Sequence, residues 1–246
     1  MTVLITVWGA SPGVGKSTLC AGLSQRLTDT GLRVDHFREE EILTRAQFSA
    51  VADEFKATGT VALETLIAAT AEFVDAVVAS GDHVVITDAL MPFVPTLLAM
   101  GHDEETIDAF MTDLTEVLAR LRPVMVFLDG DAESALSRAV AREGEQWLDW
   151  YIGKLAAYHV SPPVADAASA VKYLLRERAV TLGAARRKNW GLIMIEGADE
   201  LSPGEVLRAA EQGLKPWGGG GGRVFNVWIA KRAHIPPQVR GPAGVS

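Results

Sequence analysis

The sequence predicts an α/β fold, built on a doubly wound parallel sheet of five strands. Short β-branched runs alternate along the chain with longer segments whose apolar residues recur every three or four positions, which are the patterns of strands and of amphipathic helices. Several short runs are apolar throughout, as strands covered on both faces must be. The chain has 246 residues, 48% hydrophobic and 22% charged, enough to bury a large core. Ligands of such folds bind at the carboxyl ends of the strands.

Five strands are expected, at residues 3–8, 33–37, 84–88, 124–129 and 192–195. Segments of helical period lie between and after them, at residues 16–28, 61–79, 104–121, 132–142, 146–159, 165–182 and 202–212. Gly31, Gly81 and Gly213 are stop signals for these helices, and Ser202-Pro203 is a start signal. We therefore expect one domain over residues 1–214, with a helical lid at about residues 138–190.

The composition excludes several classes of protein. A single cysteine, Cys20, excludes an internal disulfide framework and a cysteine-rich zinc site, and it fits a reducing compartment. The first nine residues are apolar but lack a basic leader, so we expect a buried strand there instead of a signal peptide. No stretch of 18 uncharged apolar residues occurs, so no membrane span is expected and the predicted location is the cytoplasm.

Charge is unevenly distributed along the chain. The net charge is −8, yet residues 215–246 carry Lys and Arg without Asp or Glu. The remaining acidic body repels phosphate backbones, so a polynucleotide partner is not expected. Residues 218–222 are five glycines, typical of a flexible linker, and residues 223–230 have strong strand preference. We expect this C-terminal extension to dock on an edge of its own sheet or of a partner subunit's, which leaves a homodimer open. The alternative is a disordered extension.

A glycine-rich loop follows the first predicted strand directly and precedes a helix. Its sequence is Ala10-Ser11-Pro12-Gly13-Val14-Gly15-Lys16-Ser17-Thr18, the Walker A pattern with Ala in place of the first Gly, in the strand–loop–helix context that the motif requires. Gly13 and Gly15 allow backbone N–H groups to surround the β-phosphate, Lys16 bridges the β- and γ-phosphates, and Ser17 ligates Mg²⁺. The sequence therefore predicts binding of ATP and Mg²⁺ by Ser11, Pro12, Gly13, Val14, Gly15, Lys16, Ser17 and Thr18.

Motifs that the sequence lacks exclude several classes of nucleotide-binding protein. A GTPase needs an Asn-Lys-x-Asp motif to read its base, and that tetrapeptide does not occur in the sequence. Partition-type ATPases carry a second Lys early in the loop, where this chain has Ala10 and Ser11. A large oligomeric motor needs more motifs than the chain supplies. Of the classes considered, a compact kinase fits the sequence.

The sequence resembles the thymidylate kinase and deoxynucleoside kinase group of P-loop kinases, in element order from residue 3 to about residue 212. Beyond the phosphate-binding loop, Arg38-Glu39 after the second strand matches the group's Arg-Glu-Pro without its Pro. Asp88 ends the third strand, where the group has Asp-Arg or Glu-Arg, and Ala89 replaces that Arg. The fourth strand and the segment with Arg138 and Arg142 resemble the group's Leu-Asp strand and its Arg-bearing lid.

Phosphoryl transfer requires an acceptor oxygen in line with the γ-phosphate, cations that neutralise charge, and a carboxylate that orients or deprotonates the acceptor. We expect Lys16, Glu39, Asp88, Arg138 and Arg142 to be the catalytic residues. Glu39 is the first candidate for the base. Asp88 is expected to hold Mg²⁺ with Ser17, directly or through water, and a role as base is its second interpretation.

Several of these residues could have a structural role instead of a catalytic or binding one. Glu40 and Glu41 are candidates for acceptor binding together with Arg38, but acidic residues also favour the first turn of a helix. Asp88 could instead cap the next segment. Arg138 and Arg142 lie four residues apart on one helical face and could pair with Glu145 or Asp149.

The sequence thus predicts an ATP-dependent kinase that phosphorylates a hydroxyl, or a monophosphate, of a small molecule. Because an Arg is missing after Asp88 and three glutamates follow the second strand, a nucleoside-like or amine-bearing metabolite is the expected acceptor. The alternatives are a nucleoside monophosphate kinase of the thymidylate kinase type, an ATPase switch that acts on a protein partner, and a binding module without turnover.

Overall fold

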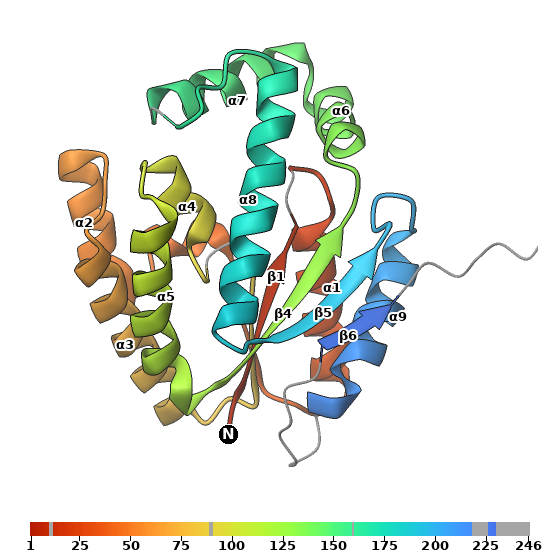
Figure 1. Cartoon of the computed structure of the whole chain (residues 1–246). Helices are drawn as coiled ribbons and strands as arrows, with labels where there is room; N and C mark the ends of the chain where they lie inside the picture. Colours follow the sequence, from red (N-terminus) through yellow and green to blue (C-terminus); the bar gives the residue numbers. More distant parts are fainter. Residues whose placement is uncertain (10–11, 89–90, 159, 218–225, 230–246) are drawn as a thin grey trace, which may run out of the picture.

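A computed structural model describes residues 1–9, 12–88, 91–158, 160–217 and 226–229 of the chain (Figure 1). A six-stranded sheet forms its centre, with strand order β2-β3-β1-β4-β5-β6. All five neighbouring pairs are parallel. The strands are β1 (Val3–Trp8), β2 (Val34–Phe37), β3 (Val84–Asp88), β4 (Arg122–Asp129), β5 (Gly191–Glu196) and β6 (Asn226–Ile229). The carboxyl ends of β1, β2 and β3 therefore meet at one edge of the sheet.

The five predicted strands and the α/β fold class are confirmed. The sixth strand, β6, lies within the stretch that has strong strand preference and pairs with the outer edge of β5. This is one of the two docking surfaces expected for the extension. Residues 218–225 and 230–246 lie outside the described residues.

Helices connect the strands in the predicted alternation. They are α1 (Lys16–Asp29), α2 (Ser49–Thr58), α3 (Leu63–Ser80), α4 (Val94–Ala99), α5 (Glu104–Val117), α6 (Ala132–Glu143), α7 (Glu145–Ala157), α8 (Ala167–Arg187) and α9 (Pro203–Leu214). Four short 3₁₀ helices complete the described part: η1 (Glu39–Leu43), η2 (Ala46–Phe48), η3 (Leu118–Arg120) and η4 (Lys215–Trp217). The sequence did not predict η2, α2 and α4, and it gave η1 only as the structural alternative for the acidic run. Helix α8 continues beyond its predicted end at residue 182 to Arg187.

Strand periodicity builds the two halves of the core. On β1, Leu4 and Trp8 face α3, α5 and α8, and they belong to the larger hydrophobic cluster. Ile5 and Val7 face the opposite side and pack with residues of α1 and α9. Figure 1 shows the corresponding layers, with α1 and α9 on one side of the sheet. No helix in the described ranges is long and apolar enough to cross a bilayer.

The lid helices have a small core of their own above the carboxyl edge of the sheet (Figure 1). Leu136, Leu155 and Tyr173 bring together α6, α7 and α8 in this cluster. The predicted lid is therefore a packed subassembly of three helices, and α8 connects it to the main core through Val180 and Leu182.

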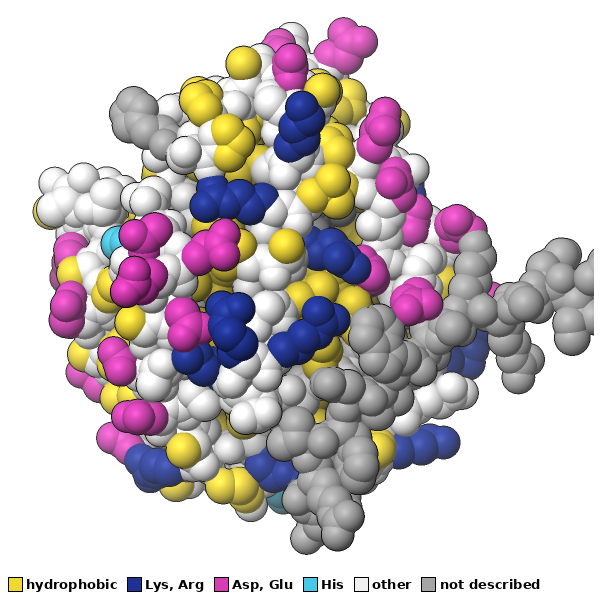
Figure 2. Space-filling view, viewed as in Figure 1, with side chains coloured by type: hydrophobic (Ala, Val, Ile, Leu, Met, Phe, Trp, Pro, Cys, Tyr) yellow, Lys and Arg dark blue, Asp and Glu magenta, His cyan; other side chains and the backbone are white. Residues whose placement is uncertain are grey.

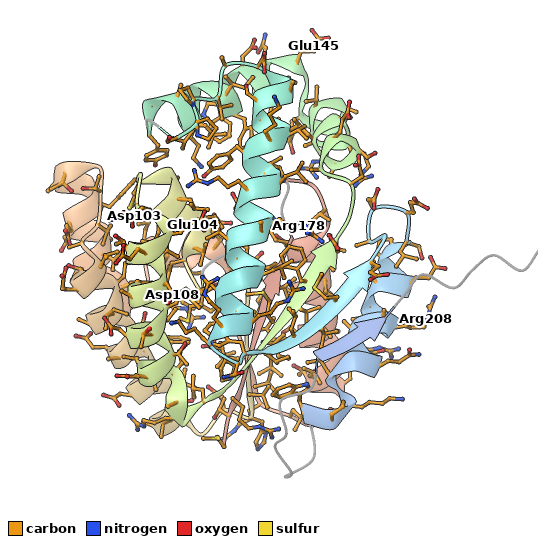
Figure 3. All side chains as sticks on the ribbon, in the orientation of Figure 1. Asp103, Glu104, Asp108, Glu145, Arg178 and Arg208 are labelled. Atoms are coloured by element: carbon orange, nitrogen blue, oxygen red, sulfur yellow. The ribbon has the colours of Figure 1, made fainter. Side chains whose placement is uncertain are left out.

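The outer face of α8 carries Lys and Arg side chains, with Asp and Glu side chains beside them (Figure 2). Arg187 and Lys188 both bind the carboxylate of Asp108 on α5, at 2.7 and 2.8 Å. Arg178, labelled in Figure 3, donates two hydrogen bonds to Asp129 at the end of β4. These pairs fix α8 to α5 and to the sheet.

The packed body continues past the predicted boundary at residue 214. Trp217 in η4 is buried with 8% of its surface exposed, and Arg122 on β4 donates a 3.1 Å hydrogen bond to its carbonyl oxygen. A Cβ at Gly191 would lie 2.2 Å from the Trp217 ring, so β5 has a glycine where this ring packs on the backbone. The start of the extension therefore belongs to the core.

Candidate functional site

Residues 12–15 of the glycine-rich loop form a turn that leads into α1. Gly13 and Gly15 have φ angles of 82° and 101°, which favour glycine. Gly15 is the N-cap of α1 and offers no side-chain hydrogen bond to the helix. A Cβ at Gly15 would meet nothing within 4 Å. The N-terminus of α1 therefore lacks a side-chain cap and borders a cleft, an arrangement suited to an anion.

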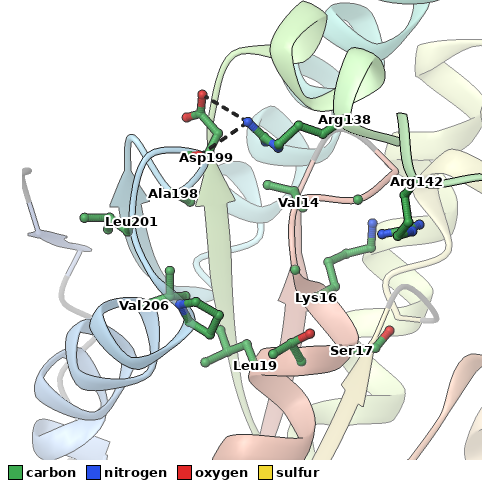
Figure 4. Close-up of a pocket in the computed structure, with 14 residues that line it drawn as sticks. Val14, Lys16, Ser17, Leu19, Arg138, Arg142, Ala198, Asp199, Leu201 and Val206 are labelled. Atoms are coloured by element: carbon green, nitrogen blue, oxygen red, sulfur yellow. Dashed lines mark hydrogen bonds and ion pairs between the residues drawn. The ribbon is translucent and has the colours of Figure 1, made fainter. Parts of the chain in front are cut away.

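A cleft of about 470 Å³ lies over this loop, between α1, α6 and the segment that joins β5 to α9 (Figure 4). Its size is typical of small-molecule sites. The predicted residues Gly13, Val14, Gly15, Lys16, Ser17 and Thr18 all line it, as do Leu19, Arg138, Arg142, Ala198, Asp199, Leu201, Pro203 and Val206. Pro12 lies in the turn that precedes Gly13, and Ser11 lies outside the described residues.

The residues of the cleft fit a nucleoside triphosphate with its magnesium ion. Lys16 and Ser17 are the first two residues of α1, at a helix N-terminus without a side-chain cap. There the lysine cation can contact phosphate oxygens, and the serine hydroxyl oxygen can contact a metal. Ala198, Leu201 and Val206 give the other end of the cleft an apolar wall, suited to a nucleobase. Within the described part of the chain, no group of three or more His, Cys, Asp or Glu side chains could hold a metal ion by itself.

Three carboxylates act on the charge of Lys16, and we refer to them as the carboxylate cluster. Burial lowers its pKa, and the negative charges of Glu177, Glu39 and Asp88 oppose this shift, with Glu177 the strongest. The three carboxylates come from α8, η1 and β3, which are far apart in the sequence. The fold thus brings two of the predicted catalytic carboxylates to the predicted catalytic lysine.

Asp88 and Glu39 are directly connected. Asp88 is buried at the end of β3, and its Oδ1 accepts a 3.1 Å hydrogen bond from the backbone N–H of Glu39. Glu39 is the first residue of η1, directly after Arg38 at the end of β2. Loss of hydration raises the pKa of Glu39, and Asp88 contributes to the rise whereas Lys16 opposes it. A carboxyl group with a raised pKa is suited to accept a proton near neutral pH.

The two lid arginines lie over the cleft. Nη1 of Arg138 is 3.3 Å from the carbonyl oxygen of Asp199 and 3.8 Å from its Oδ2 (Figure 4). Arg142 is ion-paired with Glu143 at 2.7 Å. These partners differ from Glu145 and Asp149, which the helical spacing suggested. Arg138 therefore spans the cleft from α6 to the segment after β5.

The remaining acceptor candidates lie at η1, outside the residues that line this cleft. Glu39, Glu40 and Glu41 form the first turn of that helix, and Arg38 is its N-cap, as the structural interpretation of the acidic run expected. Arg38, Glu39 and Glu40 are exposed. Glu41 is ion-paired with Arg45 at 2.9 Å.

Sequence reasoning missed Glu177. This residue lies on the buried face of α8, which also carries Tyr173 and Thr181 one turn away on either side. Burial raises the pKa of Glu177 to about 7, although Lys16 opposes the rise. One feature of the sequence could have indicated Glu177: it is a single acidic residue within the otherwise uncharged stripe of a long helix.

Two tyrosines of the lid are close enough to Glu177 for its charge to act on them. Burial raises the pKa of Tyr151 and of Tyr173, and the charge of Glu177 adds to both shifts. On α7 the ring of Trp147 stacks on Tyr151, with centroids 5.2 Å apart and planes 5° from parallel. The lid therefore places aromatic side chains next to the carboxylate cluster.

No model of a known protein family matches the sequence, and no curated protein matches it significantly. Among solved structures, the chain resembles the crystal structure of thymidylate kinase from Ehrlichia chaffeensis, with a TM-score of 0.51 and 14% sequence identity. The fold is similar to that of a P-loop kinase. The match covers 85% of this chain and 98% of the other chain. It agrees with the fold that the phosphate-binding loop and the strand ends predicted.

Proposed function

We propose that the chain is an ATP-dependent kinase that transfers the γ-phosphoryl group to a hydroxyl group of a nucleoside-like or amine-bearing small molecule. The observation that carries the proposal is the meeting of Glu39 and Asp88 with Lys16 at the carboxyl edge of the sheet. A phosphate cradle alone would serve any nucleotide-binding protein. A cradle close to a carboxylate that can orient or deprotonate an acceptor suits in-line transfer to that acceptor.

Each residue has a chemical role in this reaction. Backbone N–H groups at Gly13 and Gly15 bind the β-phosphate, and Lys16 neutralises charge on the β- and γ-phosphates. Arg138 and Arg142 approach from the lid. Magnesium, held by Ser17 and by Asp88 directly or through water, would offset further charge on the phosphates.

Glu39 is the proposed base. Its raised pKa allows the carboxylate to take the proton of the acceptor hydroxyl as the oxygen attacks phosphorus. The bond from the γ-phosphorus to the bridging oxygen breaks, and ADP leaves with that electron pair. The products are ADP and the phosphorylated acceptor.

The charge of the site favours a neutral or cationic acceptor. Glu39, Asp88 and Glu177 all act on Lys16, and an anionic group beside them would be repelled unless a cation matched it. Lys154 on α7 acts on Glu39 from the lid. Among the cations close to Glu39 in sequence, Arg38 is exposed, and Arg45 is bound to Asp35 and Glu41.

A nucleoside monophosphate kinase is the second candidate. The structural likeness to a thymidylate kinase favours it. It would require a cation for the acceptor phosphate at the end of β3, where this chain has Ala89. The two candidates therefore differ in the charge of the acceptor.

A panel of acceptors with graded charge tests the proposal. Nucleosides, aminated sugars and nucleoside monophosphates are incubated with ATP and Mg²⁺, and mass spectrometry detects the gain of one phosphate. We expect a neutral or cationic acceptor to react fastest, with no product from Lys16→Ala and normal product from Lys56→Ala, an exposed lysine on α2. Fastest turnover of a monophosphate would instead support the second candidate.

A further inference from the structure

Arg45 is bound on two sides by carboxylates. Its Nη1 and Nη2 donate 2.7 Å hydrogen bonds to the two oxygens of Asp35 on β2. Its Nε and Nη2 donate to Oε2 of Glu41 at 3.0 and 2.9 Å. We refer to Arg45, Asp35 and Glu41 as the Arg45 clamp. These bonds depend on the charge of the guanidinium group and on its planar arrangement of N–H donors, so lysine could not reproduce them.

The clamp rests on the hydrophobic core. The guanidinium carbon of Arg45 lies 4.2 Å from the ring centroid of Phe37, which is fully buried on β2. Phe37 in turn packs against Phe48 and Phe73, with centroids 5.3 and 5.2 Å away. Because 21% of the Arg45 side chain is exposed, its ion pairs are screened less than pairs on the surface.

The clamp and Asp88 hold η1 at two points. At one end, the N–H of Glu39 donates to Asp88. Two residues later, Glu41 is tied to Arg45 through its side chain, and its carbonyl oxygen accepts a 2.8 Å hydrogen bond from the N–H of Arg45. Glu39 is itself the first attachment and lies two residues before the second, so its position relative to Lys16 depends on both.

We propose that Arg45 is a positioning residue, which holds η1 so that the carboxylate of Glu39 faces the phosphate-binding loop. The inference rests on the proposed function, in which Glu39 is the base. It also limits the substrate: Arg45 would have to give up four hydrogen bonds with two carboxylates before it could bind an acceptor phosphate. Arg45 therefore serves the base and does not serve as an anion receptor.

Two variants and a matched control test the role. Arg45→Met removes the guanidinium but keeps an unbranched apolar side chain over Phe37. Arg45→Lys keeps the charge without the fork. Arg120→Met is the control, because Arg120 is ion-paired with Asp75 through a bridge in which both side chains are more than half exposed. Circular dichroism and thermal unfolding establish that each variant is folded.

Two readouts are used, and the first needs no turnover. Hydrogen exchange of the Glu39 amide reports on η1, and the amides of β1 and β4 report on global opening. We expect exchange at Glu39 to accelerate by about tenfold or more in Arg45→Met, while the strand amides stay protected. Steady-state kinetics provide the second readout, with an expected loss of about 10²-fold in kcat and an unchanged KM for ATP. Arg45→Lys should be intermediate in both readouts, and Arg120→Met should match the wild type.

Other outcomes overturn the proposal. An unchanged exchange rate at Glu39 in folded Arg45→Met would show that the clamp does not hold η1. An unchanged kcat with a higher KM for anionic acceptors alone would make Arg45 an anion receptor. If the wild type transfers phosphate to no acceptor, the proposed function fails, whereas hydrogen exchange still decides whether the clamp positions Glu39.

Discussion

The most quantitative prediction concerns Glu177 and the dependence of stability on pH. The pKa of this carboxyl group is about 7 in the folded chain, compared with a reference value of 4.5. Folding therefore makes Glu177 hold its proton more tightly. In that situation the free energy of unfolding decreases as the pH rises from about 4.5 to about 7, because the unfolded chain releases the proton first.

Glu177→Gln should remove this loss of stability. Integration between the two pKa values gives a difference of roughly 2 kcal/mol between pH 5 and pH 7.5. The variant should therefore gain about that much stability over the wild type across this interval. The gain should shrink at higher pH, since Glu177 is the strongest of the groups that support the charge of Lys16.

Urea unfolding, followed by tryptophan fluorescence at several pH values, measures the effect. Glu116→Gln is the matched control, because Glu116 is exposed on α5 and the substitution removes the same charge. The control should keep a constant offset from the wild type. If Glu177→Gln also keeps a constant offset from pH 5 to 7.5, Glu177 does not titrate as the structure requires and the carboxylate cluster around Lys16 is wrong.

Three further variants test the site and the core. Lys16→Ala should remain folded and lose at least about 10²-fold in phosphoryl transfer, by analogy with loss of one preorganised donor; normal turnover in a folded variant would refute the site. Asp88→Asn should lower kcat far more than it weakens ATP binding, and it should raise the magnesium concentration needed for activity. Full activity of this variant would show that Asp88 neither holds magnesium nor acts as the base. Truncation after Leu214 should lower the melting temperature more than truncation after Trp217, because only the first removes a buried tryptophan, whose loss costs about 3–5 kcal/mol. Equal melting temperatures would contradict that packing.

Local patterns predicted the sheet and the phosphate-binding loop. The strands are continuous apolar runs, and the loop needs only neighbouring residues in fixed order, so both can be read from short windows. The predicted positions of Asp88 and Glu39 follow from the rule that parallel strands end at one edge. In contrast, η1 and α4 have only 5 and 6 residues, too short for a helical period to emerge.

Tertiary contacts determine the rest of the site. Arg138 is paired with Asp199, 61 residues away, whereas helical spacing suggested partners one turn away. Glu177 enters the site because α8 packs against the sheet and the lid, and no local motif marks it. The partners of Arg45 are similarly decided by the path of the chain after β2, which brings a charged side chain back over Phe37.

The central claim is that the carboxylates at the edge of the sheet direct phosphate to an acceptor. The most direct measurement follows a label in the γ-phosphoryl group of ATP, with and without the best acceptor of the panel. We expect the label to appear in the acceptor, in equal amount to the ADP formed, and Lys16→Ala to abolish its transfer. Label released as inorganic phosphate, at a rate independent of any acceptor, would contradict the account and indicate an ATPase instead.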